Sequence, residues 1–505
     1  MKKIRILITT DIHGSLFPHY YHNNEIAPYS LSRISTIIKK FREKEEVIVI
    51  DNGDILQGSP FSAYAAENNI SPTPLASALN SLQYDYINLG NHDFNYGEEY
   101  LFDYLNKSNA FSICGNALYK GKAIGQSKIH ETQGIKIAFI GVVTQYIPNW
   151  EQAQNIKNFT FIDAFDYVQT EVERLKEEAD YLVVVYHGGL ERDLDSNMAT
   201  EVLTGENLGS KMINEIAEID VLVTGHQHRS IAYNSEKIVV VQANYNGNEL
   251  MSIELDIDKK ELKGSLIEVK DFAVDQAFLK PFLALEASVQ KHLDQPLGRL
   301  ASGDLLIEDP LEARLNKHPL VSFSNQILFS LAKDAQLASS ALFNTVPGFN
   351  EFVSLRDLVN NYIYPNSFAV IKMSGKNVRA MLEKSAEFFA LDNDEIIINP
   401  EFIKPKIQLY NYDMVDGIDY TIKVSNSKGE RIITCLYQGK EIADDDYFKV
   451  VMNNYRAVGG GDFSMVKESE LLYEIPTDMI SAVIDYFRQH PVVHINHKEN
   501  IKVIK

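Results

Sequence analysis

The sequence contains little cysteine and no long hydrophobic run. Its two cysteines, Cys114 and Cys435, are far apart and outside any motif, so we expect buried thiols rather than a disulfide framework or a thiolate metal site. No stretch approaches the roughly 18 apolar residues of a membrane span. The apolar stretch that follows the N-terminal lysines is also shorter than the roughly 7–15 residues of a signal-peptide core. These absences predict a cytoplasmic protein that does not enter a membrane.

Positive charge is also scarce. The chain has 48 Lys and Arg against 69 Asp and Glu, a net charge of −21, and a field of that sign repels nucleic acids and anionic membranes. We therefore expect no long nucleic acid as a partner. An anionic substrate would need a local positive charge, and bound metal ions are the natural source. The length of 505 residues indicates two or three domains, and the oligomeric state stays open.

The first half contains short apolar runs that alternate with amphipathic helical segments, a pattern typical of α/β layers. Five of these runs are predicted strands that end in polar clusters. The strands cover residues 4–8, 47–50, 86–89, 181–185 and 221–223, and the clusters read DIHG, DNGD, GNHD, HGG and GHQH. Active-site residues typically lie on loops at strand ends. Two further strands, over 238–242 and 250–255, are predicted to form a closing hairpin.

The strand-end clusters collect seven side chains that can bind metals: Asp11, His13, Asp54, Asn91, His187, His226 and His228. In an extended chain, residues i and i+2 point to the same side, so the D-x-H and H-x-H pairs can each chelate an ion. Imidazole combined with carboxylate suits Zn, Mn, Fe, Ni or Co better than Ca or Mg. Seven ligands are too many for one such ion and fit two, with Asp54 as a shared bridge. Two carboxylates against two divalent ions leave a net positive charge, which suits a phosphate substrate.

The residues after Asn91 supply candidate acid–base groups. His92 is placed to protonate a leaving alkoxide or to stabilise charge on the phosphoryl group in the transition state. Asp93 either orients His92 or is an ordinary loop carboxylate, and the sequence leaves both interpretations open. A pair of divalent ions would lower the pKa of a bridging water and align the attacking and leaving groups.

Together, the five clusters resemble the motifs of the calcineurin-like metallophosphoesterase superfamily, from residue 3 to about residue 256. The resemblance implies a four-layer αββα sandwich, a β-sandwich flanked by helices, with a dinuclear metal centre. One divalent ion would take the ligands Asp11, His13, Asp54 and His228. The other would take the ligands Asp54, Asn91, His187 and His226.

Asn95 departs from one branch of this superfamily. In the 5′-nucleotidases, an aspartate stands three residues after the catalytic histidine and forms a dyad with it, whereas this chain reads GNHDFNYG, with Asn95 at that position. Asn95 can hydrogen-bond the His92 imidazole but cannot balance an imidazolium charge. GNHDFNYG, and DNGDILQGSP at residues 51–60, instead resemble the bacterial 2′,3′-cyclic-nucleotide 2′-phosphodiesterase/3′-nucleotidases.

The character of the sequence changes after about residue 259. Residues 271–293 are predicted to form one long helix, which makes 266–300 a helical linker between a first domain at 1–265 and a second at 301–505. In the second half, the patterns predict helices over 320–332, 378–389 and 477–488 and strands over 368–371 and 448–451. The family resemblance implies that rotation between the domains, hinged near 271–298, carries substrate into the active centre.

Three loops of the second half carry aromatic residues, at 362–366, 410–413 and 453–462. Aromatic faces stack on nucleobases, although each tyrosine taken alone also fits ordinary packing. This half resembles the α/β nucleotide-binding C-terminal domain of the 5′-nucleotidase family. On that resemblance, the substrate contacts would be Tyr364 (in IYPN) and Tyr455 (in NNYRA) around a base, Asn344 (in ALFN) at its edge, and Asp462 on the ribose.

These features predict a metal-dependent phosphoesterase that hydrolyses 2′,3′-cyclic nucleotides and then 3′-nucleotides. The alternative enzyme is a 5′-nucleotidase or UDP-sugar hydrolase. Asn95 argues against it, and so does the absence of the family's substrate-gripping arginine, because TVPG follows Asn344. Gly461 also stands where the family's ribose-binding aspartate is expected, one residue before Asp462. The alternative from another class is a non-catalytic nucleotide sensor on the same scaffold.

Overall fold

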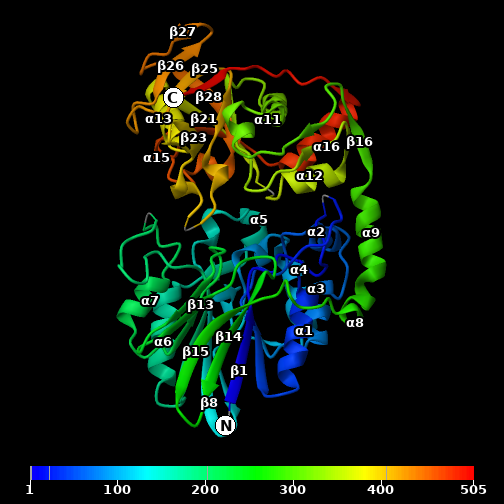
Figure 1. Cartoon of the computed structure of the whole chain (residues 1–505), viewed down its shortest axis with the longest axis vertical. Coiled ribbons are helices and arrows are strands. Elements are labelled where there is room, and N and C mark those ends of the chain that lie inside the picture. Colours follow the sequence, from blue (N-terminus) through cyan, green and yellow to red (C-terminus); the bar gives the residue numbers. More distant parts are fainter. Residues whose placement is uncertain (1–2, 22, 202, 365, 405) are drawn as a thin grey trace. The chain divides into compact units, whose positions relative to one another are not determined.

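The computed structural model describes residues 3–21, 23–201, 203–364, 366–404 and 406–505. The chain divides into two compact units, Met1–Val289 and Gln290–Lys505, coloured blue to green and green to red in Figure 1. Both cysteines are buried free thiols, as predicted. Within the described residues, no helix combines the length and the apolar character needed to cross a membrane.

The first unit contains two six-stranded sheets, of which the first has the strand order β15-β14-β1-β2-β3-β4. Its parallel strands are β1 (Lys3–Thr9), β2 (Glu46–Asp51), β3 (Tyr86–Ile87) and β4 (Phe111–Ser112). β14 (Glu249–Asp256) runs antiparallel beside β1, and β15 (Glu261–Glu268) extends the sheet beyond it. Figure 1 shows the blue β1 next to the green β14, so the first strand of this unit and one from its last third are neighbours in one sheet.

The second sheet has the strand order β12-β13-β11-β10-β8-β7. Its parallel strands are β8 (Ile135–Val143), β10 (Tyr181–His187), β11 (Val221–Val223) and β13 (Val239–Gln242). Antiparallel strands close both edges, β7 (Lys128–Thr132) and β12 (Ile231–Asn234).

The predicted hairpin between 238–242 and 250–255 is wrong. β13 pairs with β11 and β12 in the second sheet, whereas β14 crosses to the first sheet and pairs with β1 and β15. Hydrophobic pattern identifies a strand but not its partner, and all four residues of β13 are buried. Full burial suits an inner strand of a larger sheet better than a two-stranded hairpin.

Aliphatic side chains fill the space between the two sheets, with Ile4, Ile6 and Ile8 of β1 in one cluster with Val183 and Val185 of β10. Each fully buried side chain of this kind contributes roughly 1.5–3 kcal/mol. The outer face of the second sheet packs against α6 (Ala164–Leu175) and α7 (Gly209–Glu215). On the other side, α1 (Leu31–Arg42) contacts β2. The predicted helix–sheet–sheet–helix layering is confirmed.

Asn88 joins the two sheets close to the ends of their parallel strands. Its Nδ2 donates to the backbone oxygen of Val142 at 2.8 Å and to that of Val185 at 3.1 Å, at the ends of β8 and β10. It also donates to Oδ1 of Asn52 at 3.0 Å. A buried amide shared between both sheets fixes the edge at which the polar clusters meet.

The helical segment between the two halves is shorter than predicted. It begins with α8 (Gln276–Leu279), continues through a 3₁₀ turn, and ends with α9 (Leu283–Leu293). Asp275 caps it, because its carboxylate accepts the Phe278 N–H at 3.0 Å. The same carboxylate accepts the Ser35 hydroxyl at 2.5 Å and pairs with Lys39, both on α1. Thr36 of α1 also donates to the Ala273 carbonyl at 2.8 Å. The chain just before Asp275 is therefore held along α1, and the helix does not start at 271.

The second unit is built around a five-stranded mixed sheet. In spatial order its strands are β24 (Met414–Asp416), β18 (Leu337–Ser340), β28 (Tyr447–Asn453), β21 (Phe368–Ser374) and β29 (Glu470–Ile475). The three predicted helices form close to their expected positions as α11 (Pro319–Leu331), α13 (Gly375–Ala386) and α16 (Met479–Gln489). A smaller sheet contains β27 (Lys440–Glu441), β26 (Ile432–Tyr437), β25 (Asp419–Lys423) and β31 (Ile501–Ile504). The predicted α/β character holds in this unit as well.

Candidate metal centre and active site

The loops at the ends of β1, β2, β3, β10 and β11 bring the predicted metal ligands together. Two groups of three side chains have ligand atoms within 4.8 Å of one another. The first group is Asp11, His13 and His228, and the second is Asp54, His187 and His226. Asn91, the seventh predicted ligand, joins the second group, because its Oδ1 lies 2.8 Å from Nδ1 of His226.

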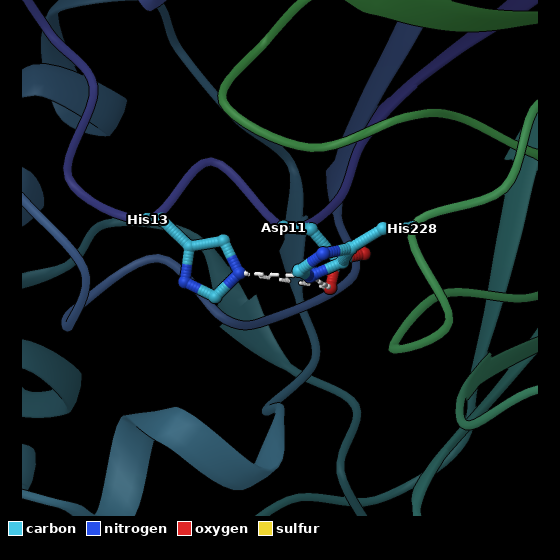
Figure 2. Close-up of side chains that lie close together, drawn as sticks. All are labelled: Asp11, His13 and His228. Carbon is cyan, nitrogen blue, oxygen red and sulfur yellow. Dashed lines mark hydrogen bonds and ion pairs between the residues drawn. The ribbon is translucent and has the colours of Figure 1, made fainter. Parts of the chain in front are cut away.

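In the first group, the side chains converge from two different loops, as Figure 2 shows. Nε2 of His228 lies 3.4 Å from Oδ1 of Asp11, and Nε2 of His13 lies 4.0 Å from the same oxygen. The two Nε2 atoms are 3.1 Å apart. Ligand atoms about 2.0–2.2 Å from a single ion are themselves separated by roughly 3.0–3.6 Å. Two of the three separations lie in this range and the third is slightly longer, so a small movement of His13 would let the group hold one divalent ion.

In the second group, Nε2 of His187 lies 3.1 Å from Oδ2 of Asp54 and 3.9 Å from Oδ1 of Asp11, so the two groups form one cluster. Both Nε2 of His187 and Oδ2 of Asp54 are buried, and neither has a hydrogen-bond partner within the described part of the chain. Buried polar atoms without hydrogen bonds are rare and costly. A cation between them would satisfy both, so the residues present fit a metal.

The backbone and neighbouring side chains orient the imidazoles of the cluster. Nδ1 of His13 donates to the Gln57 carbonyl at 2.8 Å, and Nδ1 of His187 donates to the Asn52 carbonyl at 2.6 Å. In the neutral ring, each Nε2 then carries a lone pair that faces the cluster. Nε2 of His226 instead donates to Glu206 at 2.8 Å, which leaves the Nδ1 lone pair toward Asn91. A hydrogen bond to the second ring nitrogen is typical of metal-binding histidines.

Burial and charge shift the titration of these groups in opposite directions. Burial lowers the pKa of His13 to about 4, so its imidazole is neutral, the form that binds metals. Burial has the same tendency at His187, but the carboxylates of Asp54 and Asp11 outweigh it and raise the pKa of His187 to about 10. Burial opposes ionisation of Asp54, yet the neighbouring histidines hold its pKa well below the ordinary value. The carboxylate of Asp54 and the imidazole of His187 therefore stabilise each other's charged forms before any ion binds.

Five of the candidate ligands have left-handed backbone conformations, which side chains other than glycine rarely adopt. Their φ angles are 52° at Asp11, 49° at His13, 55° at Asp54, 66° at His226 and 55° at His228. The expectation of an extended chain at the D-x-H and H-x-H pairs is therefore wrong. The two residues of D-x-H do share a group, but those of H-x-H belong to different groups.

Hydrogen bonds between the loops hold this strained backbone. The N–H of Asp11 donates to the Gly53 carbonyl at 2.9 Å, and that of His13 donates to the Asp54 carbonyl at 2.8 Å. A Cβ on Gly53 would lie 2.1 Å from the Gly90 nitrogen, so only glycine permits these loops to pack together. Each left-handed residue costs roughly 1–3 kcal/mol, which persists only where surrounding structure enforces it.

His92 lies beside the first group. Its ring centroid is 5.5 Å from that of His13 in an edge-on arrangement, and its backbone N–H donates to Oδ1 of Asp54 at 2.7 Å. Nδ1 of His92 donates to Oδ1 of Asn95 at 2.8 Å. Asn95 therefore makes a side-chain hydrogen bond to His92 from the position at which the family resemblance would lead one to expect an aspartate.

Asp93 organises the loops of the cluster. Its carboxylate accepts backbone N–H groups of four residues, at 2.8 to 3.0 Å, from Gly90, Asp54, Ile55 and Leu56. These bonds fix the DNGD loop against the GNHD loop. Of the two interpretations left open by the sequence, the geometry favours a loop carboxylate over a partner for His92.

Three residues at the cluster carry no motif that the sequence analysis could use. Trp150 stacks on the ring of His226, with centroids 5.4 Å apart, and Tyr245 stacks on His228 at 4.8 Å. Glu206, as described above, holds His226. All three come from segments outside the strand-end clusters, so only the three-dimensional structure identifies them.

The predicted substrate residues of the second unit lie on loops that contact one another. Phe343 and Tyr364 meet with centroids 5.5 Å apart, and Tyr410 and Tyr455 meet at 6.4 Å. Asn344 links the loops, since its Oδ1 accepts the Leu409 N–H at 2.9 Å and its Nδ2 donates to the Ile407 carbonyl at 3.1 Å. Its amide thus supports the neighbouring loop. Asp462 is exposed, with a φ of 66°.

Two buried arginines that the sequence analysis did not single out hold these loops in place. Arg456 pairs with Asp413 at 2.9 Å and donates to the Tyr410 carbonyl at 3.2 Å. Arg314 donates to the carbonyls of Leu342, Phe343 and Leu409 at 2.8, 3.0 and 3.3 Å. The aromatic loops are therefore braced from inside by guanidinium groups.

Comparison with known proteins matches both halves of the chain. The calcineurin-like phosphoesterase model matches residues 4–230, and the model of the 5′-nucleotidase C-terminal domain matches residues 308–468. The 2′,3′-cyclic-nucleotide 2′-phosphodiesterase/3′-nucleotidase of Salmonella typhimurium is 27% identical over 94% of this chain and 84% of its own length. The trifunctional nucleotide phosphoesterase YfkN of Bacillus subtilis is 26% identical over 97% of this chain, which spans only 38% of that protein.

The structural comparison agrees with the sequence matches. A crystal structure of a Staphylococcus aureus protein, provisionally assigned as a 5′-nucleotidase, superposes with a TM-score of 0.90 and 34% identity over the whole of both chains. The phosphoesterase family implies divalent metal ions, and the two ligand groups described above provide candidate sites for them. The chain therefore belongs to the metallophosphoesterases that combine a calcineurin-like phosphoesterase domain with a 5′-nucleotidase C-terminal domain, a family of phosphoric-ester hydrolases.

Proposed function

We propose that this chain is a metal-dependent nucleotide phosphoesterase that hydrolyses 2′,3′-cyclic nucleotides and then removes the resulting 3′-phosphate. The observation that carries the proposal is the pair of ligand groups beside His92. In it, buried atoms of Asp54 and His187 have no hydrogen-bond partner among the described residues. The relatives named as cyclic phosphodiesterases and 3′-nucleotidases support this choice of substrate.

The ligand assignment follows the two groups. Asp11, His13, Asp54 and His228 would hold one divalent ion, and Asp54, Asn91, His187 and His226 would hold a second. When bound, such a pair of ions supplies an activated water and a positive clamp on the phosphoryl oxygens. The donor set of imidazole and carboxylate favours Mn, Zn, Fe, Ni or Co.

In the proposed reaction, water attacks the phosphorus of the cyclic phosphate and the bond from phosphorus to the 2′-oxygen breaks. Nε2 of His92 donates a proton to the leaving oxygen, while Nδ1 stays bonded to Asn95. The product is a 3′-nucleotide. The proton that the attacking water loses passes to solvent, from which His92 regains a proton for the next turnover. Tyr364 and Tyr455 would stack on the base, Asp462 would bind the ribose, and Asn344 would contact the base or hold the loop that does so.

Initial rates with Mn²⁺ on 2′,3′-cyclic AMP, 3′-AMP and 5′-AMP test this proposal. A clear preference for the first two is the expected result. A preference for 5′-AMP would instead support the 5′-nucleotidase alternative. Metal binding without turnover of any nucleotide or of an aryl phosphodiester would favour the nucleotide sensor.

Replacement of His92 tests its role separately. His92→Ala should lower kcat on 2′,3′-cyclic AMP while the metal content, measured by elemental analysis, stays unchanged. Loss of activity and metal together would assign His92 a structural role at the centre instead.

A further inference from the structure

A segment that no motif predicted lies behind the His92–Asn95 pair. Nδ2 of Asn95 donates to Oε2 of Glu151, and the other oxygen of Glu151 accepts from Nδ2 of Asn155 at 2.8 Å. Asn155 also donates to the backbone carbonyl of Asn95 at 2.9 Å. The contacts from residues 151–155 therefore hold both the side chain and the backbone of Asn95.

Trp150, directly before this segment, also contacts the metal-ligand cluster. Trp150 stacks on His226, and the short helix α5 (Ala153–Ile156) contacts α4 (Gly97–Lys107), which follows directly after Asn95 and Tyr96. Glu151 is only partly exposed, and its Oε1 also accepts the N–H of Gln152 at 2.7 Å. The position of its carboxylate is thus defined from both sides.

The direction of each hydrogen bond in this chain determines which ring nitrogen of His92 carries the hydrogen. A carboxylate is only an acceptor, so Glu151 requires the NH₂ end of the Asn95 amide to face it. The carbonyl end of Asn95 must then face His92, and it accepts a hydrogen only if Nδ1 of His92 carries one. Nε2 is left as the nitrogen that exchanges a proton with other groups.

An asparagine alone would not impose this order. Its amide can rotate by half a turn and present NH₂ to the imidazole, which would favour the opposite tautomer. An aspartate has no such ambiguity. Glu151 removes the ambiguity from Asn95, because only one orientation of the amide satisfies its carboxylate.

We propose that Glu151 is a positioning residue for His92, acting through Asn95. The carboxylate–amide–imidazole chain does with two residues what the aspartate of the related dyad does with one. The catalytic consequence rests on the proposed function, in which His92 protonates the leaving oxygen. The tautomer itself does not depend on that function.

A carboxylate–amide exchange tests the proposal directly. Glu151→Gln should reduce kcat on 2′,3′-cyclic AMP by about 10- to 100-fold, the usual effect of losing an outer-shell partner, with KM and metal content nearly unchanged. The double variant Asn95→Asp/Glu151→Gln restores a carboxylate acceptor for His92 and an amide behind it, so we expect recovery to within a few-fold of the wild type. Wild-type kcat in Glu151→Gln, or no recovery in the double variant, would overturn the proposal. Glu236→Gln, which neutralises an exposed carboxylate on the β12–β13 connection, is the matched control.

The leaving group separates positioning from a general loss of structure. A p-nitrophenyl phosphodiester releases a stable anion that needs no proton, so Glu151→Gln should lose little rate on it. An equal loss on both substrates would assign Glu151 a merely structural role.

Nitrogen-15 NMR of the histidine side chains gives a readout that is independent of activity. The wild type should show His92 with hydrogen on Nδ1, assigned by the absence of that signal in His92→Gln, and Glu151→Gln should lose this preference. If the tautomer responds but no nucleotide is hydrolysed, the proposed function fails while the positioning role stands. If the tautomer is the same in both proteins, the positioning role fails.

Discussion

Asp54, a proposed metal ligand, and Tyr455, a proposed base-stacking residue, are held in place in two different ways. Asp54 follows a parallel strand almost directly, and the loops around it pack so closely that Gly53 and Gly90 have no room for a Cβ. Tyr455 lies on a short helix, α14 (Asn454–Ala457), in a loop region held by the buried Arg456. The first site is fixed by backbone packing and the second by long side chains that reach into the loops.

This difference explains why one site could be predicted from the sequence more completely than the other. A site made at strand ends can be read from the local sequence, because a polar pair directly after an apolar run must lie at the end of the strand that the run forms. A loop region braced by buried guanidinium groups depends on partners more than 40 residues away, such as Asp413 for Arg456. We therefore expect single substitutions at the first site to change mainly the rate of hydrolysis. Single substitutions at the second site should change mainly the free energy of unfolding.

The largest effect should come from Asp54, the carboxylate that we propose both ions share. Asp54→Asn removes a charge that faces His187 at 3.1 Å and that both proposed ions use. We expect a loss of about 10⁴-fold in turnover of an aryl phosphodiester, as for other central catalytic groups, with loss of bound metal. Glu261→Gln, exposed on β15, should leave the rate unchanged. A moderate loss with full metal content would contradict the bridging role.

The second unit should respond most strongly in its stability. Arg456→Met leaves Asp413 buried without its charged partner, and such losses cost about 3–5 kcal/mol in the free energy of unfolding. The two side chains are 3% and 5% exposed, whereas those of the pair Arg488–Asp485 are 74% and 63% exposed. Arg488→Met should therefore change stability by less than about 1 kcal/mol. Equal effects of the two variants in chemical denaturation would remove the contrast between the sites.

Binding of the base should show an intermediate effect. If Tyr455 stacks on the nucleobase, Tyr455→Ala should weaken nucleotide binding by about 1–3 kcal/mol, seen as a higher KM for 2′,3′-cyclic AMP. Hydrolysis of a p-nitrophenyl phosphodiester, which has no base, should not change. Tyr447→Ala, 61% exposed on β28, is the control. A loss on both substrates would show that the loop, and not the stacking, was affected.

The smallest effect concerns acid stability of the second unit. His318 caps α11 by accepting the Leu320 N–H at 3.2 Å, and burial lowers its pKa below the ordinary value of 6.5. The unfolded chain then binds this proton more tightly than the folded chain. The contribution of neutral His318 to stability is therefore fully present above pH 6.5 and is lost as the pH falls below it. His318→Asn keeps a capping group without the titration, and should flatten this decline by on the order of 1 kcal/mol at most. An unchanged slope of unfolding free energy between pH 5 and 6.5 would exclude His318 as its source.

The sequence predicted the metal-ligand cluster because parallel strands place their carboxyl ends at one edge. It did not predict the left-handed backbone at Asp11 or His226, since φ at these positions is set by contacts with other loops. It also assigned β13 to the wrong partner, because strand pairing depends on topology that hydrophobic pattern does not contain. The start of the linker helix depends on Asp275 being held by α1, a contact more than 200 residues away in the chain.

Long-range contacts also limited what could be predicted for the second unit and for Glu151. The aromatic loops were visible in the sequence, but Arg314 and Arg456 looked like any other basic residues. Glu151 was equally inconspicuous, because its partner Asn95 is 56 residues distant. Residues that act through one another are found only once the chain is folded.

The stack of Trp150 on His226 has a practical consequence. Trp150 is the single tryptophan of the chain, and its ring lies 5.4 Å from the ring of a proposed metal ligand. Emission excited at the red edge of the indole band therefore comes from one known position, next to the centre. Paramagnetic ions such as Mn²⁺ or Co²⁺ quench nearby fluorophores, so the unlabelled protein carries its own optical sensor for loading of the second ligand group.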